Sequence, residues 1–289
     1  SNAMIDHADK TMVWVHDENG SGLHADGAAR VSVLDHGFTV ADGVFETLKV
    51  ERGMVFALQR HLSRLRRSIA AIGLPEPDLS AIESAVEATV AANAASIGVR
   101  ARLRITYTGG LGPLGSDRFC GVPTWVVAVA PTRPWPATAI LHTVAWPLNE
   151  RGPLVGIKST SYAENVMALA DAHAHGADEA LWLNTRGELC EGSGSNIFVV
   201  TSGRVFTPEL RSGCLGGITR ELLLEWCTIS EIALTKADLI AADEVFITSS
   251  TRDVQPVSVV DGRKLPAPGP MTTTVQAEFA HRAGLEPNP

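Results

Sequence analysis

The sequence has few of the residues that disulfide-linked, membrane-spanning or nucleic-acid-binding proteins require. Only 4 of the 289 residues are cysteine, and 6% are aromatic. No apolar run approaches the roughly 20 residues of a membrane helix, and no secretory leader precedes residue 20. Lysine and arginine total 24 against 32 acidic residues, and the net charge of −8 argues against a general nucleic-acid surface. The sequence therefore predicts a soluble, cytoplasmic protein that binds neither membrane nor nucleic acid.

The cysteines also form no recognisable pattern. Their spacing pairs them neither with one another nor with the nine histidines in the way that a structural metal site requires. We expect reduced and mostly buried thiols, and we predict no metal site. The four residues are Cys120, Cys190, Cys214 and Cys227.

The composition suits a globular protein with one or two cores, since 45% of the residues are hydrophobic and 19% are charged. Residues 131–136 (PTRPWP) contain three prolines, which exclude a helix or a central strand, so we place the domain boundary there. The expected organisation is a small α+β domain at residues 4–130, a linker at 131–137 and a larger domain at 138–289. Residues 1–3 resemble the remnant of a cleaved tag.

Apolar periodicity predicts the secondary structure of both domains. In the small domain we expect strands at 12–15, 30–34, 44–51, 54–58, 102–107 and 125–129, and helices at 59–72 and 78–94. In the large domain we expect strands at 138–146, 154–157, 179–184, 195–200, 204–206, 229–234, 243–248 and 256–260, and helices at 161–175, 217–228 and 271–284. The large domain lacks a regular alternation of strand and helix, which favours a mixed, barrel-like fold over a doubly wound sheet. The predicted fold class is α+β.

A lysine between a predicted strand and a predicted helix is the first candidate for chemistry. Lys158 follows residues 154–157 (LVGI), which look like a short buried strand, and it precedes a helix whose apolar positions suit packing on the core. A partly desolvated ammonium gives up its proton more readily, and the amine can then attack a carbonyl to form an imine. Because most lysines are solvated surface charges, Lys158 gains weight only from residues further along the chain.

Two later segments supply the groups that an imine-forming cofactor needs. Glu191 precedes a glycine- and serine-rich turn, so its carboxylate can face inward from a strand end and keep a pyridinium nitrogen protonated. Residues 213–217 (GCLGG) precede a predicted helix, and the backbone N–H groups at such a helix start can bind phosphate. The lysine, the acid and the phosphate-binding loop together predict pyridoxal 5'-phosphate as the cofactor.

In combination these segments resemble the class IV aminotransferase family, the fold-type IV pyridoxal-phosphate enzymes. That family includes branched-chain and D-amino acid aminotransferases and 4-amino-4-deoxychorismate lyase. The matching segments follow the family's order and lie at residues 35–47, 60–65, 158–165, 177–198, 217–220 and 248–251. The resemblance implies a small α+β domain before a larger, mixed, barrel-like one. It also implies a homodimer whose active site borrows a loop from the partner subunit.

The resemblance assigns roles to individual residues. Lys158 would be the Schiff-base lysine and proton shuttle, and Glu191 would hold the ring nitrogen. The other cofactor-binding candidates are Arg64, Ile218, Thr219, Ser250 and Thr251 at the phosphate and Tyr162 at the ring hydroxyl. Phe45, Tyr107 and Arg252 are candidate substrate contacts. From the residues alone, Arg64 could also be a solvated helix residue, and Phe45 and Tyr162 could be packing residues.

The reaction itself stays open between a lyase and a transaminase. Residues 45–47 (FET) resemble lyase members, because branched-chain aminotransferases commonly place a glycine after the acid and D-aminotransferases a tyrosine before it. The lyase and D-aminotransferase members usually carry an arginine for the substrate carboxylate where this strand ends in residues 106–108 (TYT), and that difference favours other members. We therefore expect aminodeoxychorismate lyase first and a branched-chain or D-amino acid aminotransferase second. A non-catalytic binding protein is the remote alternative.

The glycine-rich segment at residues 109–115 (GGLGPLG) is interpreted as a flexible loop that contacts the substrate. It is not interpreted as a dinucleotide-binding loop, because Pro113 stands where a helix would begin and no ribose-binding acid follows at the expected distance.

Overall fold

The chain forms two compact units in the computed structural model, which describes residues 11–119 and 121–289. The expected tag remnant and Cys120 lie outside the described residues. Unit 1 comprises the chain up to Arg133 together with Lys158–Ser161, and unit 2 comprises Pro134–Ile157 and Tyr162–Pro287. The chain leaves unit 1 inside the proline-rich segment 131–137, but the return of Lys158–Ser161 to unit 1 interrupts the continuous second domain that we expected.

Unit 1 is built on one antiparallel sheet whose strands follow the order β2-β1-β6-β5-β3-β4. The strands are β1 (Met12–Asp17), β2 (Gly20–Ala25), β3 (Gly43–Glu51), β4 (Met54–Val55), β5 (Arg100–Thr108) and β6 (Thr124–Pro131). Three helices belong to the unit: α1 (His36–Thr39), α2 (Leu58–Ala71) and α3 (Leu79–Ala92). The long β3–β5 pairing runs from Gly43 opposite Thr108 to Glu51 opposite Arg100, so it fixes the register of the whole sheet.

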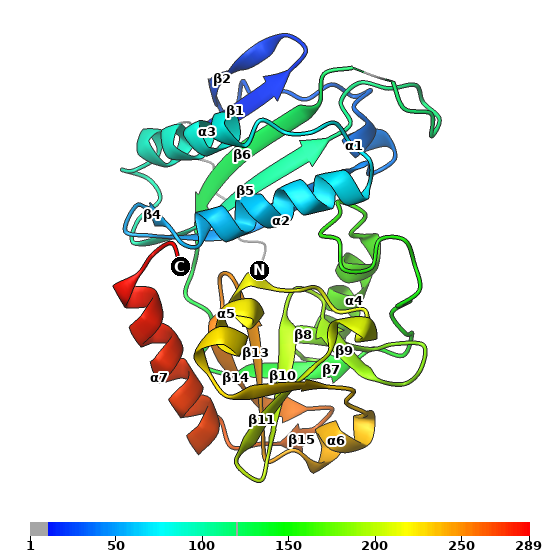
Figure 1. Ribbon diagram of the computed structural model, residues 1–289, viewed down its shortest axis with the longest axis vertical. Coiled ribbons are helices and arrows are strands. Elements are labelled where there is room, and N and C mark those ends of the chain that lie inside the picture. Colours follow the sequence, from blue (N-terminus) through cyan, green and yellow to red (C-terminus); the bar gives the residue numbers. More distant parts are fainter. Residues whose placement is uncertain (1–10, 120) are drawn as a thin grey trace. The chain divides into compact units, whose positions relative to one another are not determined.

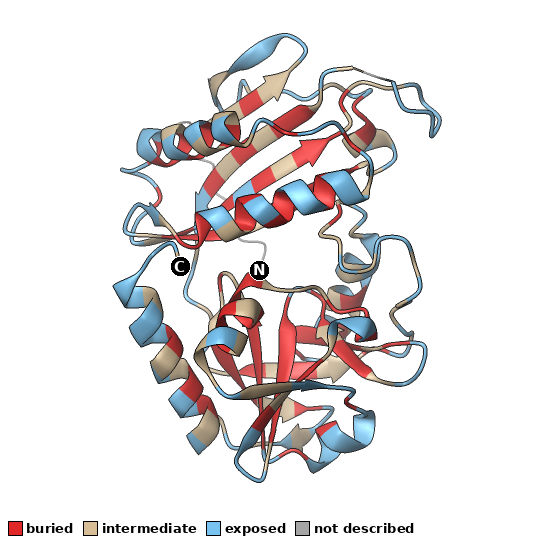
Figure 2. Cartoon of the chain, viewed as in Figure 1, coloured by how far each residue is buried: buried red, intermediate tan, exposed pale blue. Residues whose placement is uncertain are grey.

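Helices α2 and α3 pack against the sheet, α2 on β3 and α3 on β6, as the apolar periodicity predicts. Figure 2 shows that α2 is buried along one side only, and Leu62, Leu65 and Ile69 lie on that side. Each such side chain stabilises the fold by roughly 1.5–3 kcal/mol relative to an exposed position. Helix α3 starts where it does because the carboxylate of Asp78 accepts a hydrogen bond (3.0 Å) from the N–H of Ala81.

The predictions for the start of unit 1 were wrong in two places. Residues 17–27, expected to be a turn-rich connection, contain strand β2, which forms a hairpin with β1 in which Asp17 lies opposite Gly20. Residues 30–34, expected to be a strand, form an irregular segment in which Val33 is 72% exposed. The apolar alternation of that segment was mistaken for a half-buried strand because periodicity carries no information about which surface is covered.

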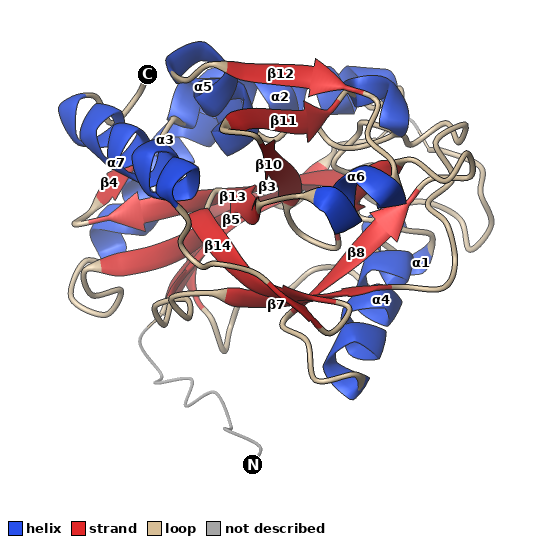
Figure 3. Cartoon of the chain, turned by 90° about the horizontal axis from the view of Figure 1, so that it is seen from below, coloured by secondary structure: helices blue, strands red, loops and turns tan. Residues whose placement is uncertain are grey.

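Unit 2 contains a closed ring of strands, which confirms the mixed, barrel-like fold. Its strands are β7 (Ala139–Thr143), β8 (Glu179–Leu183), β9 (Leu189–Gly192), β10 (Asn196–Thr201), β11 (Arg204–Pro208), β12 (Ile229–Ile232), β13 (Glu244–Ser249), β14 (Asp253–Val260) and β15 (Arg263–Lys264). The ring follows the order β10-β13-β14-β7-β8-β9 and closes where Asn196 of β10 pairs with Glu191 of β9. Figure 3 shows β7, β8, β10, β13 and β14 around this ring, and β11 and β12 extend the sheet beyond β10.

The helices of unit 2 lie outside the ring. They are α4 (Ala163–Ala174), the short η1 (Leu210–Ser212), α5 (Ile218–Trp226), α6 (Lys236–Ala241) and α7 (Pro270–Leu285) (Figure 1). Helix α4 buries Ala168 and Ala172 in a cluster with Trp182, whereas Val166 and Met167, also expected to pack on the core, are exposed. The sequence analysis missed β9, β15 and α6 because each is too short to show a periodicity. Within residues 11–119 and 121–289, no helix combines the length and the apolarity needed to span a bilayer.

Candidate functional site

Lys158 is held by strand β3 of unit 1 rather than by a strand of its own. The N–H of Phe45 donates to the carbonyl of Lys158 (2.9 Å), and the N–H of Thr160 donates to the carbonyl of Gly43 (2.9 Å). The hydroxyl of Thr160 adds a hydrogen bond to the carbonyl of Ala41 (2.9 Å). Segment 158–160 therefore fills the hydrogen-bonding edge of the first residues of β3, which fixes the backbone of the candidate lysine.

The predicted strand before Lys158 does not exist. Residues 154–157 form a turn in which Gly156 has a positive φ of 73° and Leu154 is 40% exposed. A four-residue apolar run is too short to separate a buried strand from a turn, so the prediction failed on length. The helix that follows is confirmed, because α4 begins at Ala163.

Two cationic side chains lie over the ring of Phe45. The Nζ atom of Lys158 lies 4.4 Å from the ring centroid, and the guanidinium carbon of Arg104 lies 3.8 Å from it. Phe45 is itself buried, so the ring forms a rigid, electron-rich wall beside the amine. Arg104 also donates from Nε to the hydroxyl of Thr106 (3.0 Å), which holds its guanidinium over the same ring.

A buried ion-pair cluster lies next along β3. Arg64 donates from Nε and Nη2 to the two carboxylate oxygens of Glu46 (2.8 and 2.6 Å), and Nδ1 of His61 donates to the same carboxylate (2.7 Å). Burial alone would raise the pKa of Glu46, but the charge of Arg64 and the hydrogen bonds from Arg64 and His61 outweigh it and hold this pKa at about 2. Burial lowers the pKa of His61, so its imidazole is neutral at pH 7. Arg64 is thus not a solvated helix residue.

Replacing Glu46 with glutamine should lower the free energy of unfolding by roughly 3 kcal/mol at pH 7, because the native pKa lies at about 2 and the reference value is 4.5. Between those two values the unfolded state binds more protons, so the advantage of the wild type over Glu46→Gln should shrink as the pH falls from about 4.5 towards 2. Urea unfolding of both proteins from pH 7 to pH 3 measures this difference.

The matched control for that prediction is Glu76→Gln, which breaks an exposed ion pair with Arg66. Such a surface pair contributes less than about 1 kcal/mol, so the control should behave like the wild type at every pH. A difference between wild type and Glu46→Gln that stays constant down to pH 3 would contradict the role of this carboxylate.

In unit 2, Glu191 lies on β9 at the closure of the ring and is partly buried, so it is not a turn glutamate in water. Its Oε2 atom accepts a hydrogen bond (2.8 Å) from the N–H of Leu215. Burial raises the pKa of the Cys190 and Cys214 thiols, and the charge of Glu191 raises both further, that of Cys214 to about 11. These two cysteines are therefore inert thiols at neutral pH, as expected.

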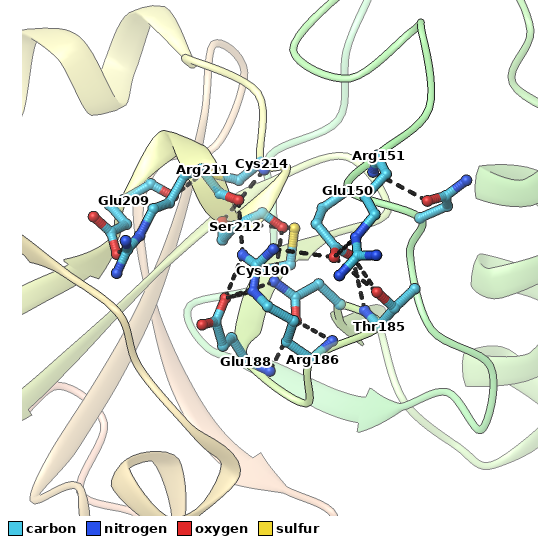
Figure 4. Close-up of polar contacts among 12 residues, drawn as sticks. Glu150, Arg151, Thr185, Arg186, Glu188, Cys190, Glu209, Arg211, Ser212 and Cys214 are labelled. Carbon is cyan, nitrogen blue, oxygen red and sulfur yellow. Dashed lines mark hydrogen bonds and ion pairs between the residues drawn. The ribbon is translucent and has the colours of Figure 1, made fainter.

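The loop that carries Leu215 is tied to the hairpin before β9 by a hydrogen bond from Arg186, whose guanidinium is held by ion pairs (Figure 4). Arg186 donates from Nη2 to the carbonyl of Arg211 (2.9 Å) and forms ion pairs with Glu150 (3.1 Å) and Glu188 (2.6 Å). Because one guanidinium joins the loop to two carboxylates, it fixes the loop by more than a single surface pair would. The Leu215 N–H is thereby held in place to orient the carboxylate of Glu191.

The start of α5 offers backbone donors for a phosphate. Helix α5 begins at Ile218, and its N-cap residue, Gly217, provides no side chain to accept from the first N–H groups. A Cβ atom at position 217 would come within 2.1 Å of Oδ1 of Asn196, so only glycine fits. Ile218 and Thr219, both predicted phosphate contacts, are the first two residues of this helix.

The buried hydroxyl of Thr248 lies on the same face of the ring of strands as Asn196. Thr248 pairs with Asn196 across β13 and β10, so their side chains share one face, and Asn196 donates to the carbonyl of Leu215 (2.8 Å). Within the described residues, Oγ1 of Thr248 is buried and has no hydrogen-bond partner. Ser250 and Thr251 follow directly in the turn after β13. This set of donors fits the phosphate group of pyridoxal phosphate.

The turn after Glu191 is organised around a second, buried acid. The carboxylate of Glu179 accepts from the N–H of Ser193 (3.1 Å) and from the hydroxyls of Ser193 and Ser195. The carbonyl of Ser193 in turn accepts from the hydroxyl of Tyr162 (3.1 Å) and from the amide of Asn165 (2.8 Å). The start of α4 is therefore bonded to this turn. The predicted bond from Tyr162 to a cofactor hydroxyl stays a prediction.

Two of the three predicted substrate contacts are not placed for that role. Tyr107 is 2% exposed, and its hydroxyl donates to the carbonyl of Pro75 (2.9 Å), so it is a core residue of unit 1. The Arg252 side chain is 5% exposed, forms an ion pair with Glu179 (3.3 Å) and lies 3.7 Å from the Trp135 ring centroid. These contacts make Arg252 a structural residue of unit 2.

The glycine-rich loop at residues 109–115 is pinned to the segment before α1, contrary to the expected flexibility. The N–H of Gly112 donates to the carbonyl of Leu34 (3.2 Å), and Nε2 of His36 lies 2.9 Å from the carbonyl oxygen of Pro113. A Cβ atom at position 112 would come within 2.2 Å of the His36 ring, so glycine is required there.

Sequence reasoning missed Arg104 as a site residue. The end of β5, residues 106–108, contains no arginine, and this was the position at which a carboxylate-binding arginine was expected. The signal was present two residues earlier, because Arg102, Arg104 and Thr106 alternate with the buried Leu103 and Ile105 and so share one face of the sheet. Register then places Phe45 opposite Thr106, beside Arg104.

Comparison with known proteins identifies what the chain is similar to. The model of the family described as amino-transferase class IV matches residues 43–260. A Mycobacterium tuberculosis protein named as a bifunctional aminodeoxychorismate lyase and D-amino acid transaminase is 30% identical over 268 residues, covering 84% of this chain and 88% of its own length. The branched-chain aminotransferase of Thermoproteus uzoniensis, solved with norvaline, has a TM-score of 0.85 and 30% identity over 94% of each chain. The structure of a hypothetical aminotransferase from M. tuberculosis in its PLP-bound form has a TM-score of 0.81 and 28% identity, over 92% of this chain and 97% of its own.

Proposed function

The chain belongs to the class IV aminotransferase family, whose members use pyridoxal phosphate, and we propose that it is a transaminase exchanging the amino group of an amino acid with a 2-oxo acid. The observation that carries the proposal is the pair of cations on Phe45. Lys158 provides the amine that the cofactor chemistry needs, and Arg104 provides a guanidinium that can bind a substrate carboxylate beside it.

Each unit by itself offers groups that could bind part of the cofactor. Arg64 and the start of α5 would bind the phosphate with Ser250 and Thr251, and Glu191 would keep the ring nitrogen protonated. When bound, pyridoxal phosphate supplies an electron sink for charge that develops at the substrate carbon. Lys158 would hold the aldehyde carbon and, once released by the incoming amine, would move the proton at that carbon through Nζ.

The lyase activity that the sequence favoured becomes the second candidate. Residues 45–47 still resemble lyase members, and one M. tuberculosis relative is named for both activities. The transaminase comes first because the family and the two solved structures reported above are named as aminotransferases. Arg104 removes the argument that β5 lacks a carboxylate-binding arginine, which had counted against the lyase, and so it keeps the lyase as the second candidate. A cytoplasmic location stays a prediction.

The deciding experiment incubates the cofactor-loaded protein separately with aminodeoxychorismate and with panels of L- and D-amino acids plus 2-oxoglutarate or pyruvate. We expect amino-group exchange without release of 4-aminobenzoate. Release of 4-aminobenzoate and pyruvate would replace the transaminase by the lyase, and the absence of either reaction would overturn both.

Arg104→Ala tests the proposed carboxylate contact in the same assay. Loss of a hydrogen bond to a charged group should raise KM for the carboxylate-bearing substrate by roughly 10- to 100-fold, with a smaller effect on kcat. Arg102→Ala is the matched control, because Arg102 is exposed on the same face of β5 two residues earlier. An equal change in both variants would mean a general effect of charge instead of a specific contact.

Arg64→Ala should raise the concentration of cofactor needed for half-maximal activity far more than it lowers the rate at saturation, because phosphate binding is shared by ground state and transition state. The variant also leaves Glu46 without its main partner. Glu46→Gln is therefore the control, since it breaks the same ion pair and keeps the guanidinium. Equal losses of cofactor affinity in the two variants would show that Arg64 acts only through Glu46.

We also propose a homodimer. Several exposed apolar side chains of unit 1 lie in residues 31–40 and in the loop at 109–115, which hydrogen bonds join, and Phe38 (75% exposed) and Leu114 (79%) are the most exposed of them. Val40 is also exposed, and Leu111 is partly exposed. Sedimentation at micromolar concentration tests the proposal: we expect a dimer, and a fully active monomer would contradict it.

A further inference from the structure

Two histidines and an aspartate of unit 2 form a cluster that the proposed reaction does not use. His142 lies on β7, Asp171 lies in α4, and His175 is the C-cap residue of α4. One potential ligand atom from each of the three residues lies within 4.8 Å of the others. The two imidazole rings are stacked with centroids 4.0 Å apart. The sequence analysis predicted no metal site, because the four cysteines show no metal-binding spacing with the nine histidines.

The fold brings these residues together through two periodicities. On β7, Ile140 packs against the hydrophobic cluster that contains Ala168 and Ala172 of α4. Alternation along the strand puts His142 on the same face as Ile140. On α4, Asp171 and His175 are four residues apart, so their side chains lie on one side of the helix. Strand and helix thus meet with two imidazoles and one carboxylate between them.

His175 has the hydrogen-bonded partner that metal-binding histidines usually have, and His142 has a carboxylate nearby. Nδ1 of His142 lies 3.8 Å from the carboxylate of Asp261, beyond hydrogen-bond distance, and that carboxylate accepts from the N–H of Thr143 (2.7 Å). Nδ1 of His175 lies 2.9 Å from the carbonyl of Asp171, and a carbonyl only accepts, so this nitrogen carries the hydrogen. The lone pair of His175 is then on Nε2. The carbonyl bonded to His175 is a second partner of the kind that orients metal-ligating histidines, and the Asp261 carboxylate is near enough to take that role for His142 after a small shift of the ring.

One of the ligand distances already suits a small divalent transition metal ion, and the stacked imidazoles would turn towards the ion on binding. Ligands bound to zinc at about 2.0–2.2 Å in a tetrahedral arrangement lie about 3.3 Å from one another. Nε2 of His142 and Oδ2 of Asp171 already lie 3.4 Å apart. The His142, Asp171 and His175 side chains are 24%, 30% and 54% exposed, so an ion can reach them from solvent and keep water as a further ligand.

We propose that His142, Asp171 and His175 bind one zinc-class divalent ion that links β7 to the end of α4, with Asp261 orienting His142. Two nitrogen ligands and one oxygen ligand favour zinc over magnesium or calcium, which prefer all-oxygen sites. The ion would be structural, because it joins two elements of one unit and no residue assigned above to the cofactor belongs to it.

Titration of the cofactor-loaded protein with Co²⁺ and then Zn²⁺ in a metal-free buffer tests the proposal. We expect one equivalent of Co²⁺ per chain to give visible d–d absorption, which one equivalent of Zn²⁺ removes, and we expect Zn²⁺ to raise Tm. His142→Gln and His175→Gln should each weaken binding by at least about 100-fold, and Asp261→Asn by about 10- to 100-fold. His173→Gln is the matched control, because His173 is exposed on the same helix and lies outside the cluster.

Binding lost in the two cluster variants and kept in His173→Gln would establish the site. The circular dichroism of each variant, recorded before titration, separates loss of ligands from loss of fold, and His175→Gln at an exposed position is the variant least able to disturb folding. Equal binding in the wild type and all four variants, equal loss in His173→Gln, or no saturable binding by the wild type would overturn the proposal and leave the cluster as a set of histidine–aspartate ion pairs.

Discussion

Replacing Lys158 with alanine is expected to reduce turnover by at least about 10⁴-fold, because one amine is lost from both its covalent role and its proton-transfer role. The fold should survive, since segment 158–160 is held to β3 through backbone atoms that alanine keeps. The variant should still bind pyridoxal phosphate through the phosphate-binding residues, so cofactor affinity should fall much less than the rate. Steady-state kinetics and equilibrium dialysis measure the two effects separately.

Borohydride reduction provides an independent readout of the same prediction. In the wild type it should attach the cofactor covalently to Lys158, and peptide mapping locates the modified residue. Lys158→Arg keeps a cation beside Phe45 but supplies no nucleophile, so it should be as inactive as the alanine variant. Lys264→Ala, on the short strand β15 of unit 2, is the matched control and should be fully active and labelled. Label on any other lysine, or activity in either Lys158 variant, would refute the assignment.

Replacing Glu191 with glutamine should slow turnover by on the order of 10²- to 10³-fold, the usual cost of losing one preorganised electrostatic partner at a reacting centre. The amide oxygen of glutamine can still accept from the Leu215 N–H, so the loop and the closure of the ring of strands should be preserved. Its amide nitrogen can only donate, and it therefore cannot keep the pyridine nitrogen protonated. Cofactor content and the melting temperature should stay close to those of the wild type.

Glu188→Gln is the control for this prediction. Glu188 lies in the same hairpin and pairs with Arg186 (Figure 4), but without this pair Arg186 keeps its ion pair with Glu150 and its hydrogen bond to Arg211, so turnover should change little. The comparison separates the charge at position 191 from the general negative charge of the hairpin. Near-normal turnover by Glu191→Gln would show that another group holds the ring nitrogen, and an equal loss in both variants would show that the loop is being disturbed.

Much of the candidate site could be predicted because its residues lie in recognisable local sequence patterns. Glu191 was found from a carboxylate before a glycine- and serine-rich turn, and Gly217 to Thr219 from glycines before an amphipathic helix. Both signals depend on neighbours within a few residues, which is the range over which sequence patterns are informative. The structure places Glu191 on a strand end and starts α5 at Ile218, as these patterns indicate.

The partners of these residues could not be predicted, because they come from distant parts of the chain. Nothing in the sequence indicates that Glu46 lies against Arg64, 18 residues later, or that Glu179 organises the turn at Ser193. Tyr107 shows the opposite error. It was predicted to contact the substrate, but its side chain is buried in the core of unit 1. Such outcomes depend on which face of a strand is covered, and periodicity alone does not decide that.

The sequence by itself determined the family, the cofactor and the order of the functional segments, because each of these depends on residue types at short spacing along the chain. Only the tertiary structure decided that Lys158 completes the edge of β3, that Arg104 joins it on Phe45, and that His142 meets Asp171 and His175. The physical reason is that each of these contacts forms across strands or between a strand and a helix. Sheet register and helix packing create such contacts, and both are settled only when the whole unit folds.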